Sequence, residues 1–469
     1  MGTREEANAL HRSKGTLDMT EGSIWKLLVS FAFPMLLGNI FQQLYNTVDS
    51  YVVGNFVSKE ALAAVGSAGP IISTLIGLFA GLANGAGIVV SQYYGAKQAE
   101  MVRKTVETAV LMTLVMCVIF TVAGILGAPM MLRFMGTPED VWDDSKAYLT
   151  IYFAGASGLM LYNIGSGILR AVGNTRIPLI SLVISAVTNV VLDLLFVVKF
   201  KMGVAGVAWA TIIAEAVSAV FVLSVLVAAK GPHRLRIFHM HFYRNVFQRI
   251  FQIGIPSAVQ MAITSFSNTF VQSYVYAYGA ECMAGYTIYA KVDTFAMLPF
   301  VCLNAAYATF AGQNLGAGKK DRLYAGLKTA RIMNYAVVTP TVVLVILLRA
   351  QLAGFFNSDP NVIYYGGIFL MCITPGYLVG AFNDPLVSLM QGCGETRAPM
   401  LTGLGAFVVF RQIYLAVLTR LTPSFLVIGF AYPIGWLVRA LSIYIFHRTS
   451  HWEEKYMNLD FRGDTVTAK

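Results

Sequence analysis

The sequence predicts an all-α integral membrane protein with twelve transmembrane helices in two six-helix bundles. Apolar residues are 57% of the 469 residues and charged residues only 12%, about half the charged share of a typical soluble domain. Apolar stretches long enough to cross a bilayer of roughly 30 Å as helices recur along the chain. The second half of the chain also repeats the first. The stretches lack the ten-residue alternation of barrel strands, so helices are expected.

The spans alternate with short polar segments. We predict them at 26–53, 61–88, 104–127, 145–168, 178–199, 203–228, 252–279, 283–309, 329–350, 362–388, 400–420 and 425–446. Six spans in each half give the two copies the same orientation. We therefore expect a pseudo-twofold axis along the membrane normal that relates the two bundles.

A duplicated phrase defines the repeat. Residues 173–178, Gly-Asn-Thr-Arg-Ile-Pro, return at 394–399 as Gly-Glu-Thr-Arg-Ala-Pro, 221 positions later. Nearly the same offset carries Pro34 onto Pro256. A duplication of this length in a very apolar chain is typical of a two-lobed transporter.

The charges predict the topology. With residue 1 inside, 24 of the 34 Lys and Arg residues lie in or beside inner segments, seven in outer segments, and three within spans: Lys291, Arg411 and Arg439. This imbalance places both termini in the cytoplasm. The net charge of +10 is therefore a topology signal, and we expect no nucleic-acid partner. The expected segments are a cytoplasmic N-terminal segment at 1–25, an N-lobe at 26–229, a basic linker on the inner leaflet at 230–251, a C-lobe at 252–446 and a cytoplasmic tail at 447–469.

Acidic residues inside the spans indicate chemistry, because a charge at mid-membrane costs about 2.5–3.5 kcal/mol on insertion scales. The polar residues of the first span share one helix face at successive helical steps: Gln42, Tyr45, Asn46 and Asp49. On the fifth span, Asn189 and Asp193 form a similar stripe, and Thr211 of the sixth lies at a comparable depth. Two carboxylates with amide and hydroxyl oxygens predict a site for a hard cation such as Na+, or for a proton.

The second half lacks this constellation, since positions 49, 189 and 193 map onto Val271, Phe410 and Tyr414. The asymmetry places the predicted coupling site in the N-terminal lobe. The alternative is that Asp49 and Asp193 are interhelical hydrogen-bonding residues with a structural role.

Weaker candidates lie elsewhere. Gln272, Asp293 and Asp384 are predicted to contact a cationic substrate in the C-terminal lobe, with local polar packing as the alternative. Gln42 and Asn46 of the first span are further weak candidates for substrate contact. Asn163 maps onto Asp384, so both copies are polar there. Pro34 interrupts the hydrogen bonds of the first span and predicts either a bend used in gating or a static kink.

Together these motifs resemble the multidrug and toxic compound extrusion (MATE) family, in its bacterial branch, over about residues 20–447. The resemblance implies two six-helix bundles and export of drugs and organic cations driven by inward Na+ or H+. The family's N-lobe cation site would map onto Asp49, Asn189, Asp193 and Thr211, with Tyr45 and Asn163 nearby. Some members carry a carboxylate on the seventh span, where this chain has Val271 and Gln272.

The sequence thus predicts a secondary multidrug antiporter of a bacterial cytoplasmic membrane, working as a monomer by alternating access. Its partners would be organic cations or drugs and membrane lipids, with no cofactor besides the coupling ion, Na+ or H+. A flippase for lipid-linked glycans is the alternative. An enzyme is not expected, because the sequence contains no clustered metal ligands, phosphate loop or nucleophile motif.

Overall fold

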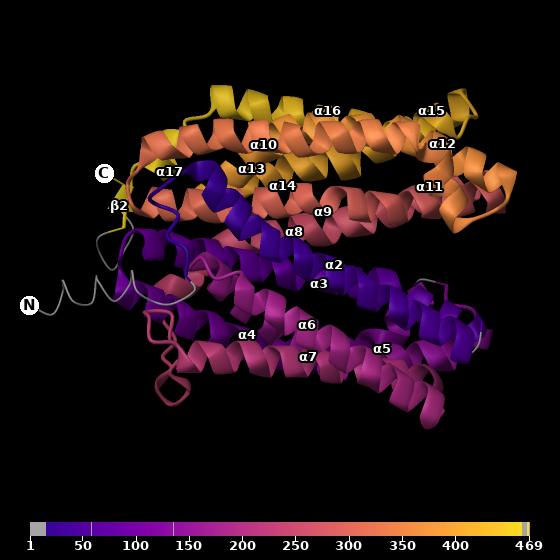
Figure 1. The fold of residues 1–469 in the computed structure, drawn as a ribbon, viewed down its shortest axis with the longest axis horizontal. Coiled ribbons are helices and arrows are strands. Elements are labelled where there is room, and N and C mark those ends of the chain that lie inside the picture. The colour runs from indigo at the N-terminus through magenta and orange to yellow at the C-terminus, as the bar shows by residue number, and fades with distance from the viewer. Residues whose placement is uncertain (1–15, 58, 135, 462–466, 469) are drawn as a thin grey trace, which may run out of the picture. The chain divides into compact units, whose positions relative to one another are not determined.

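The computed structural model describes residues 16–57, 59–134, 136–461 and 467–468. The remaining parts of the predicted N-terminal segment (1–15) and tail (462–466 and 469) lie outside the described residues. The long helices (Figure 1) are α2 (Ile24–Phe56), α3 (Lys59–Gly95), α4 (Ala99–Phe134), α5 (Trp142–Ala171), α6 (Arg176–Asp193), α7 (Gly203–Ala228), α8 (Arg244–Tyr276), α9 (Ala280–Gly316), α10 (Lys320–Leu347), α12 (Pro360–Ile373), α13 (Tyr377–Cys393), α15 (Arg411–Leu421) and α16 (Leu426–Thr449).

Shorter elements complete the chain. They are the helices α11 (Arg349–Phe356), α14 (Arg397–Leu404) and α17 (Trp452–Met457), and the helical turns η1 (Glu139–Val141), η2 (Leu194–Lys199), η3 (Ile237–His239), η4 (Thr374–Gly376) and η5 (Gly405–Phe410). The strands β1 (Leu459–Asp460) and β2 (Thr467–Ala468) form one antiparallel pair in the C-terminal tail, which the sequence did not predict.

Every predicted span coincides with a helix or a chain of consecutive helices, so the all-helical architecture is confirmed. Ten stretches of the described chain are long and apolar enough to cross a membrane. The other two spans, α5 and α8, are more polar but have 30 and 33 residues, about 45 Å or more at 1.5 Å per residue. Because α5 packs against α3, α4 and α7, much of its surface meets protein instead of lipid.

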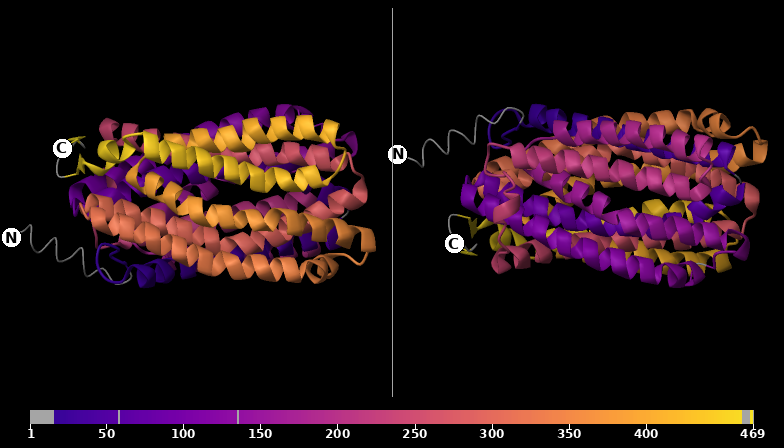
Figure 2. Two further views of the ribbon diagram at one scale, coloured as in Figure 1. Left: turned by 90° about the horizontal axis from the view of Figure 1, so that it is seen from above. Right: turned by 90° about the horizontal axis from the view of Figure 1, so that it is seen from below.

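The chain forms two compact units. Of the described residues, unit 1 comprises those of Phe33–Ala258 together with 16–18, and unit 2 comprises Met19–Ala32 with those of Val259–Lys469. Within unit 1, α5 lies along α7 and also contacts α3 and α4 (Figure 1). In unit 2, α9 contacts α10, α12 and α13, while α16 packs on α12 and α13; the orange and yellow helices of this unit are seen in Figure 2.

The duplicated phrase is a helix stop followed by a helix start. Gly173 lies two residues after the end of α5 and Gly394 directly after the end of α13, with φ of 86° and 96°. In both copies the amide of the residue after the glycine donates a hydrogen bond to a carbonyl five residues earlier, from Asn174 to Leu169 at 2.8 Å and from Glu395 to Met390 at 2.8 Å. This is the Schellman pattern, and the left-handed conformation it needs is the reason for glycine.

The next helix is then capped by the residue that follows the glycine. Asn174 Oδ1 accepts a hydrogen bond from the Ile177 amide at 3.2 Å, and Glu395 Oε1 accepts one from the Ala398 amide at 2.9 Å. Asn and Glu differ in the two copies but perform the same task, which satisfies an otherwise free amide at a helix N-terminus. The repeat is therefore a repeat of local structure as well as of sequence.

Candidate cation site

The first part of the site is the polar face of α2. This helix is unbroken from Ile24 to Phe56 and contains Pro34, so one backbone hydrogen bond is absent in its first third. Asp49 lies two turns before the helix ends. Its Oδ1 atom is buried and has no hydrogen-bond partner among the described residues.

The second part is the end of α6. Asp193 is the last residue of that helix and is fully buried at 0% exposure, and Asn189 one turn earlier is 1% exposed. The chain continues directly into η2, a π-helical turn, and such turns occur preferentially at functional sites. The carboxyl groups of Asp193 and Asp49 are close enough to interact directly. Both are acceptors when ionised, so no hydrogen bond joins them unless one holds a proton.

Glu215 of α7 adds a third carboxyl group, surrounded by tyrosines. The Tyr152 hydroxyl is hydrogen-bonded to Glu215. Tyr148, one turn earlier on α5, lies within electrostatic range of Glu215 and of both aspartates. Neither tyrosine was predicted from the sequence. Their spacing of four residues places them on one face of α5, but the same spacing is ordinary in a packed helix, and only the tertiary contacts make them distinctive.

Six polar atoms of this cluster are buried without a hydrogen-bond partner in the described residues. They are Asp49 Oδ1, both side-chain polar atoms of Asn189, both carboxyl oxygens of Asp193, and Glu215 Oε2. Buried polar groups are nearly always satisfied in folded proteins, and leaving one unsatisfied costs about 1–3 kcal/mol. A concentration of such atoms in one place therefore indicates a site that a cation or protons would satisfy.

The chemistry of the donors fits a small hard cation or a proton. Carboxylate and amide oxygens favour hard cations, and two adjacent carboxyl groups in a low-dielectric setting favour a shared proton. Across the described residues, no three His, Cys, Asp or Glu side chains are grouped closely enough to hold a metal ion. The candidate donor set is accordingly the Asp49 and Asp193 pair with Asn189, and Glu215 lies beside it.

The remaining residues predicted for this site have other contacts. Thr211 donates its hydroxyl hydrogen to the Val207 carbonyl at 2.9 Å, and Asn163 donates to the Leu159 carbonyl at 2.9 Å, each within its own helix. Tyr45 is hydrogen-bonded to Gln42 and lies in electrostatic range of Asp49. Asn46 is exposed. The direct cation contacts of Thr211, Asn163 and Tyr45 stay predictions, as do the substrate contacts of Gln42 and Asn46.

The weaker candidates belong to unit 2. Asp293 accepts a hydrogen bond from the Tyr377 hydroxyl. Asp384 forms an ion pair with Arg439, whose Nη1 lies 3.0 Å from Oδ1. Gln272 is half-buried. Contact of these side chains with substrate stays a prediction, and Arg439 already compensates the charge of Asp384.

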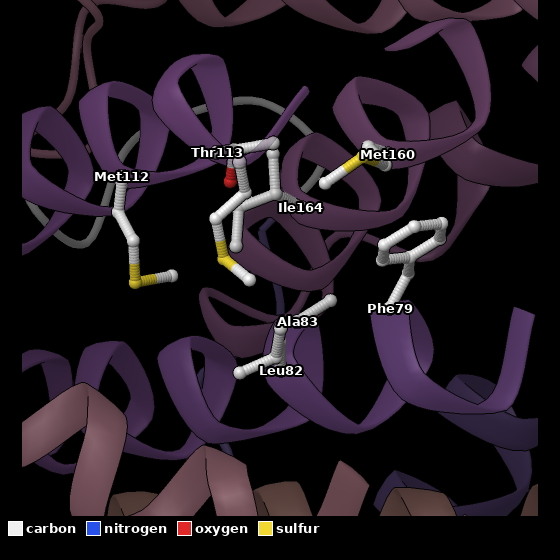
Figure 3. Close-up of a pocket in the computed structure, with 8 residues that line it drawn as sticks. Phe79, Leu82, Ala83, Met112, Thr113, Met160 and Ile164 are labelled. Atoms are coloured by element: carbon white, nitrogen blue, oxygen red, sulfur yellow. The ribbon is translucent and has the colours of Figure 1, made fainter. Parts of the chain in front are cut away.

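Unit 1 also contains a small apolar cavity, shown in Figure 3. Side chains of α3, α4 and α5 line it: Phe79, Leu82, Ala83, Met112, Thr113, Met116, Met160 and Ile164. Thr113 contributes a hydroxyl group to the lining, and this hydroxyl donates its hydrogen to the Ala109 carbonyl. Three methionines give the lining an adaptable surface, and no acid of the cation site belongs to it.

A helical membrane protein with an internal duplication and an acidic cluster within its spans has the features of a membrane transporter. The MatE family model matches the chain twice, at residues 34–195 and 256–417, so that one offset of 222 separates both ends of the two matches. These matches cover more than half of the sequence. The chain therefore belongs to the MATE family, and is a membrane transporter, not an enzyme.

Individual proteins are similar over nearly the whole length. The probable multidrug resistance protein YoeA of Bacillus subtilis is 27% identical over 450 residues, which are 94% of this chain and 96% of the relative. A MOP superfamily transporter from Pyrococcus furiosus, described as having a binding pocket of reversed polarity, has a TM-score of 0.87 at 22% identity and covers 93% of this chain and 97% of its own. An outward-facing multidrug resistance MATE transporter has a TM-score of 0.86 at 22% identity. The match covers 93% of this chain and 97% of that transporter. These likenesses confirm the fold of twelve helices in two bundles.

Proposed function

We propose that this protein is a secondary antiporter that exports organic cations and other drugs in exchange for Na+ or H+. The observation that carries the proposal is the cluster of unsatisfied carboxyl oxygens at Asp49, Asp193 and Glu215. Relatives named as multidrug resistance proteins support the substrate class.

The acids act as the coupling site in this mechanism. An incoming cation or proton occupies the space between Asp49 and Asp193 and removes the repulsion between the two carboxylates. The change in charge alters the contacts of the polar face of α2. Because Pro34 removes a backbone hydrogen bond, α2 bends there at lower cost than elsewhere. The bend links occupation of the cation site to substrate release, and alternating access follows.

The topology forms part of the same proposal. Both termini lie in the cytoplasm of a bacterial cell because the basic residues concentrate on that side of the predicted spans. The lobes at 26–229 and 252–446 each contribute six spans, with the linker at 230–251 on the inner leaflet and the protein working as a monomer. Modification of single introduced cysteines in intact cells by a membrane-impermeant thiol reagent tests the orientation.

The experiment uses purified protein in sealed vesicles with ethidium as the probe. A Na+ gradient alone and a pH gradient alone are imposed in turn, and dye movement is recorded. We expect movement under one of the two gradients, which identifies the coupling ion. A folded protein that moves dye under neither gradient would contradict cationic-drug antiport and would favour a lipid-linked or anionic substrate.

A further inference from the structure

Unit 2 contains a buried cation that the coupling mechanism does not use. Arg411 is the first residue of α15 and lies near the middle of the eleventh span, directly after the π-helical turn η5. Its side chain is 3% exposed. The positions of unit 2 that correspond to the acids of unit 1 are Val271 and Tyr414, so the polarity of the two halves differs.

No carboxylate of the described residues forms an ion pair with Arg411. Its Nη2 atom donates to Ser267 Oγ at 2.9 Å and to Asn268 Oδ1 at 2.8 Å, and both acceptors are neutral. The Nε atom is buried and has no hydrogen-bond partner in the described structure. Arg439, in the same unit, also has a buried Nε without a partner among the described residues, but its charge is paired with Asp384. A buried charge without a counterion is costly, and a guanidinium with a free Nε retains a donor for an anion.

The groups around Arg411 are suited to an organic anion. The guanidinium carbon lies 5.1 Å from the ring centre of Tyr432 and 5.9 Å from that of Phe407. The hydroxyls of Tyr286 and Tyr432 are 2.6 Å apart. One proton suffices for that hydrogen bond, so the second phenol proton remains available to another acceptor. A carboxylate attached to an aromatic ring would find a cation, a hydroxyl donor and aromatic faces together.

We propose that Arg411 is the recognition point for a carboxylate or sulfonate on the exported compound. This inference rests on the proposed export function and names its substrate class: aromatic compounds that carry an acidic group, alone or together with a cationic one. Unit 1 keeps its acids for the coupling ion, and the arginine of unit 2 selects the negative group. Because the guanidinium is closed off in this structure, the aromatic side chains beside it must move before the anion reaches it.

The test compares two dyes that differ in one group. A rhodamine with a free benzoate and the methyl ester of the same dye have the same aromatic body, but only the first carries the carboxylate. Export of both is measured in vesicles for the unaltered protein, Arg411→Gln and Arg411→Lys. We expect Arg411→Gln to reduce export of the free acid by at least about tenfold and to leave the ester unchanged. Arg411→Lys retains the charge but loses the planar fork, so partial export of the acid is expected.

The outcomes separate the two proposals. Equal loss of both dyes in Arg411→Gln, or no loss of either, overturns the anion site. To separate misfolding from lost recognition, binding of each dye to the detergent-solubilised proteins is followed by fluorescence polarisation. Arg411→Gln that binds the ester normally and the acid weakly supports the inference, whereas equal weakening for both dyes refutes it. If the unaltered protein moves neither dye under a gradient, the export function fails, and the binding comparison still decides the role of Arg411.

Discussion

At the residue scale, the central feature is a set of buried acids in unit 1 with carboxyl oxygens that have no hydrogen-bond partner among the described residues. Acids that only connect helices would have their oxygens satisfied by neighbouring donors. Here both carboxyl oxygens of Asp193 and one of Asp49 have no hydrogen-bond partner in the described structure. That difference favours the coupling role over the structural alternative that the sequence left open.

Glu215 provides a separate prediction at this scale. Glu215→Gln keeps the shape of the side chain and an acceptor for Tyr152, but it removes one negative charge beside the aspartate pair. The concentration of Na+ or H+ that gives half-maximal dye export should therefore rise by about tenfold. The exposed Glu281 at the start of α9 supplies the control, since Glu281→Gln should leave that concentration unchanged. An unchanged value in Glu215→Gln would exclude Glu215 from the site.

The sequence predicted the acids but not their surroundings. The stripe on α2 and the Asn189 and Asp193 pair are visible because helical periodicity places them on one face. The ion pair of Asp384 with Arg439 was not predictable, nor was the lack of a carboxylate partner for Arg411 among the described residues. Both depend on the register between helices that are distant in sequence, which the periodicity of a single helix does not specify.

At the element scale, the two copies of the duplicated phrase form the same kind of helix end, which depends on a glycine. A Cβ atom added at Gly173 would lie 2.1 Å from the Leu17 carbonyl oxygen, and its φ is +86°. Gly173→Ala should therefore lower the stability by more than the roughly 1–2 kcal/mol of a left-handed alanine alone. Gly136→Ala is the matched control, since Gly136 has a φ of +68° but open space around it. Thermal unfolding in detergent should show the larger loss for Gly173→Ala, and equal losses would argue against the clash.

The linker contains a buried histidine that makes the stability of the fold depend on pH. His233 lies between α7 and η3, and burial lowers its pKa to about 4, below the ordinary value of 6.5. The folded protein therefore holds this ring neutral, while the unfolded chain takes up a proton as the pH falls below about 6.5. The resulting stability is complete above that pH and is lost on acidification towards pH 4, by about 3 kcal/mol at most.

Measured melting temperatures test this contribution. Between pH 7 and pH 5, the unaltered protein should lose more stability than His233→Gln, in which no ring titrates at this position. The exposed His239 serves as the control, because His239→Gln should keep the full pH response. Identical pH responses of all three proteins would show that His233 does not contribute.

The spans were predictable as elements because their length and hydropathy are set by the bilayer. The interruptions within single spans were not predictable from the sequence. The breaks between α12 and α13 and the π-helical turns η2 and η5 lie inside continuous apolar stretches. Their residues also fit an uninterrupted α-helix, so only tertiary packing decides where the helix loosens.

At the scale of the whole molecule, the two halves share one duplicated fold but differ in the charge of their buried polar residues. The family model matches both halves at one offset, and the repeated loops have the same hydrogen bonds. Among the described residues, unit 1 contains carboxyl oxygens without hydrogen-bond partners, and unit 2 contains an arginine without a carboxylate partner. We assign ion coupling to unit 1 and recognition of an anionic group to unit 2.

The most direct test of the coupling claim is gradient-driven ethidium export by the variant Asp49→Asn with Asp193→Asn. It should be compared with the unaltered protein and with Asp144→Asn, which alters an exposed acid at the start of α5. We expect the double variant to bind the dye but to show no export in response to the Na+ or H+ gradient, while Asp144→Asn exports normally. Near-normal gradient-driven export by the double variant would contradict it.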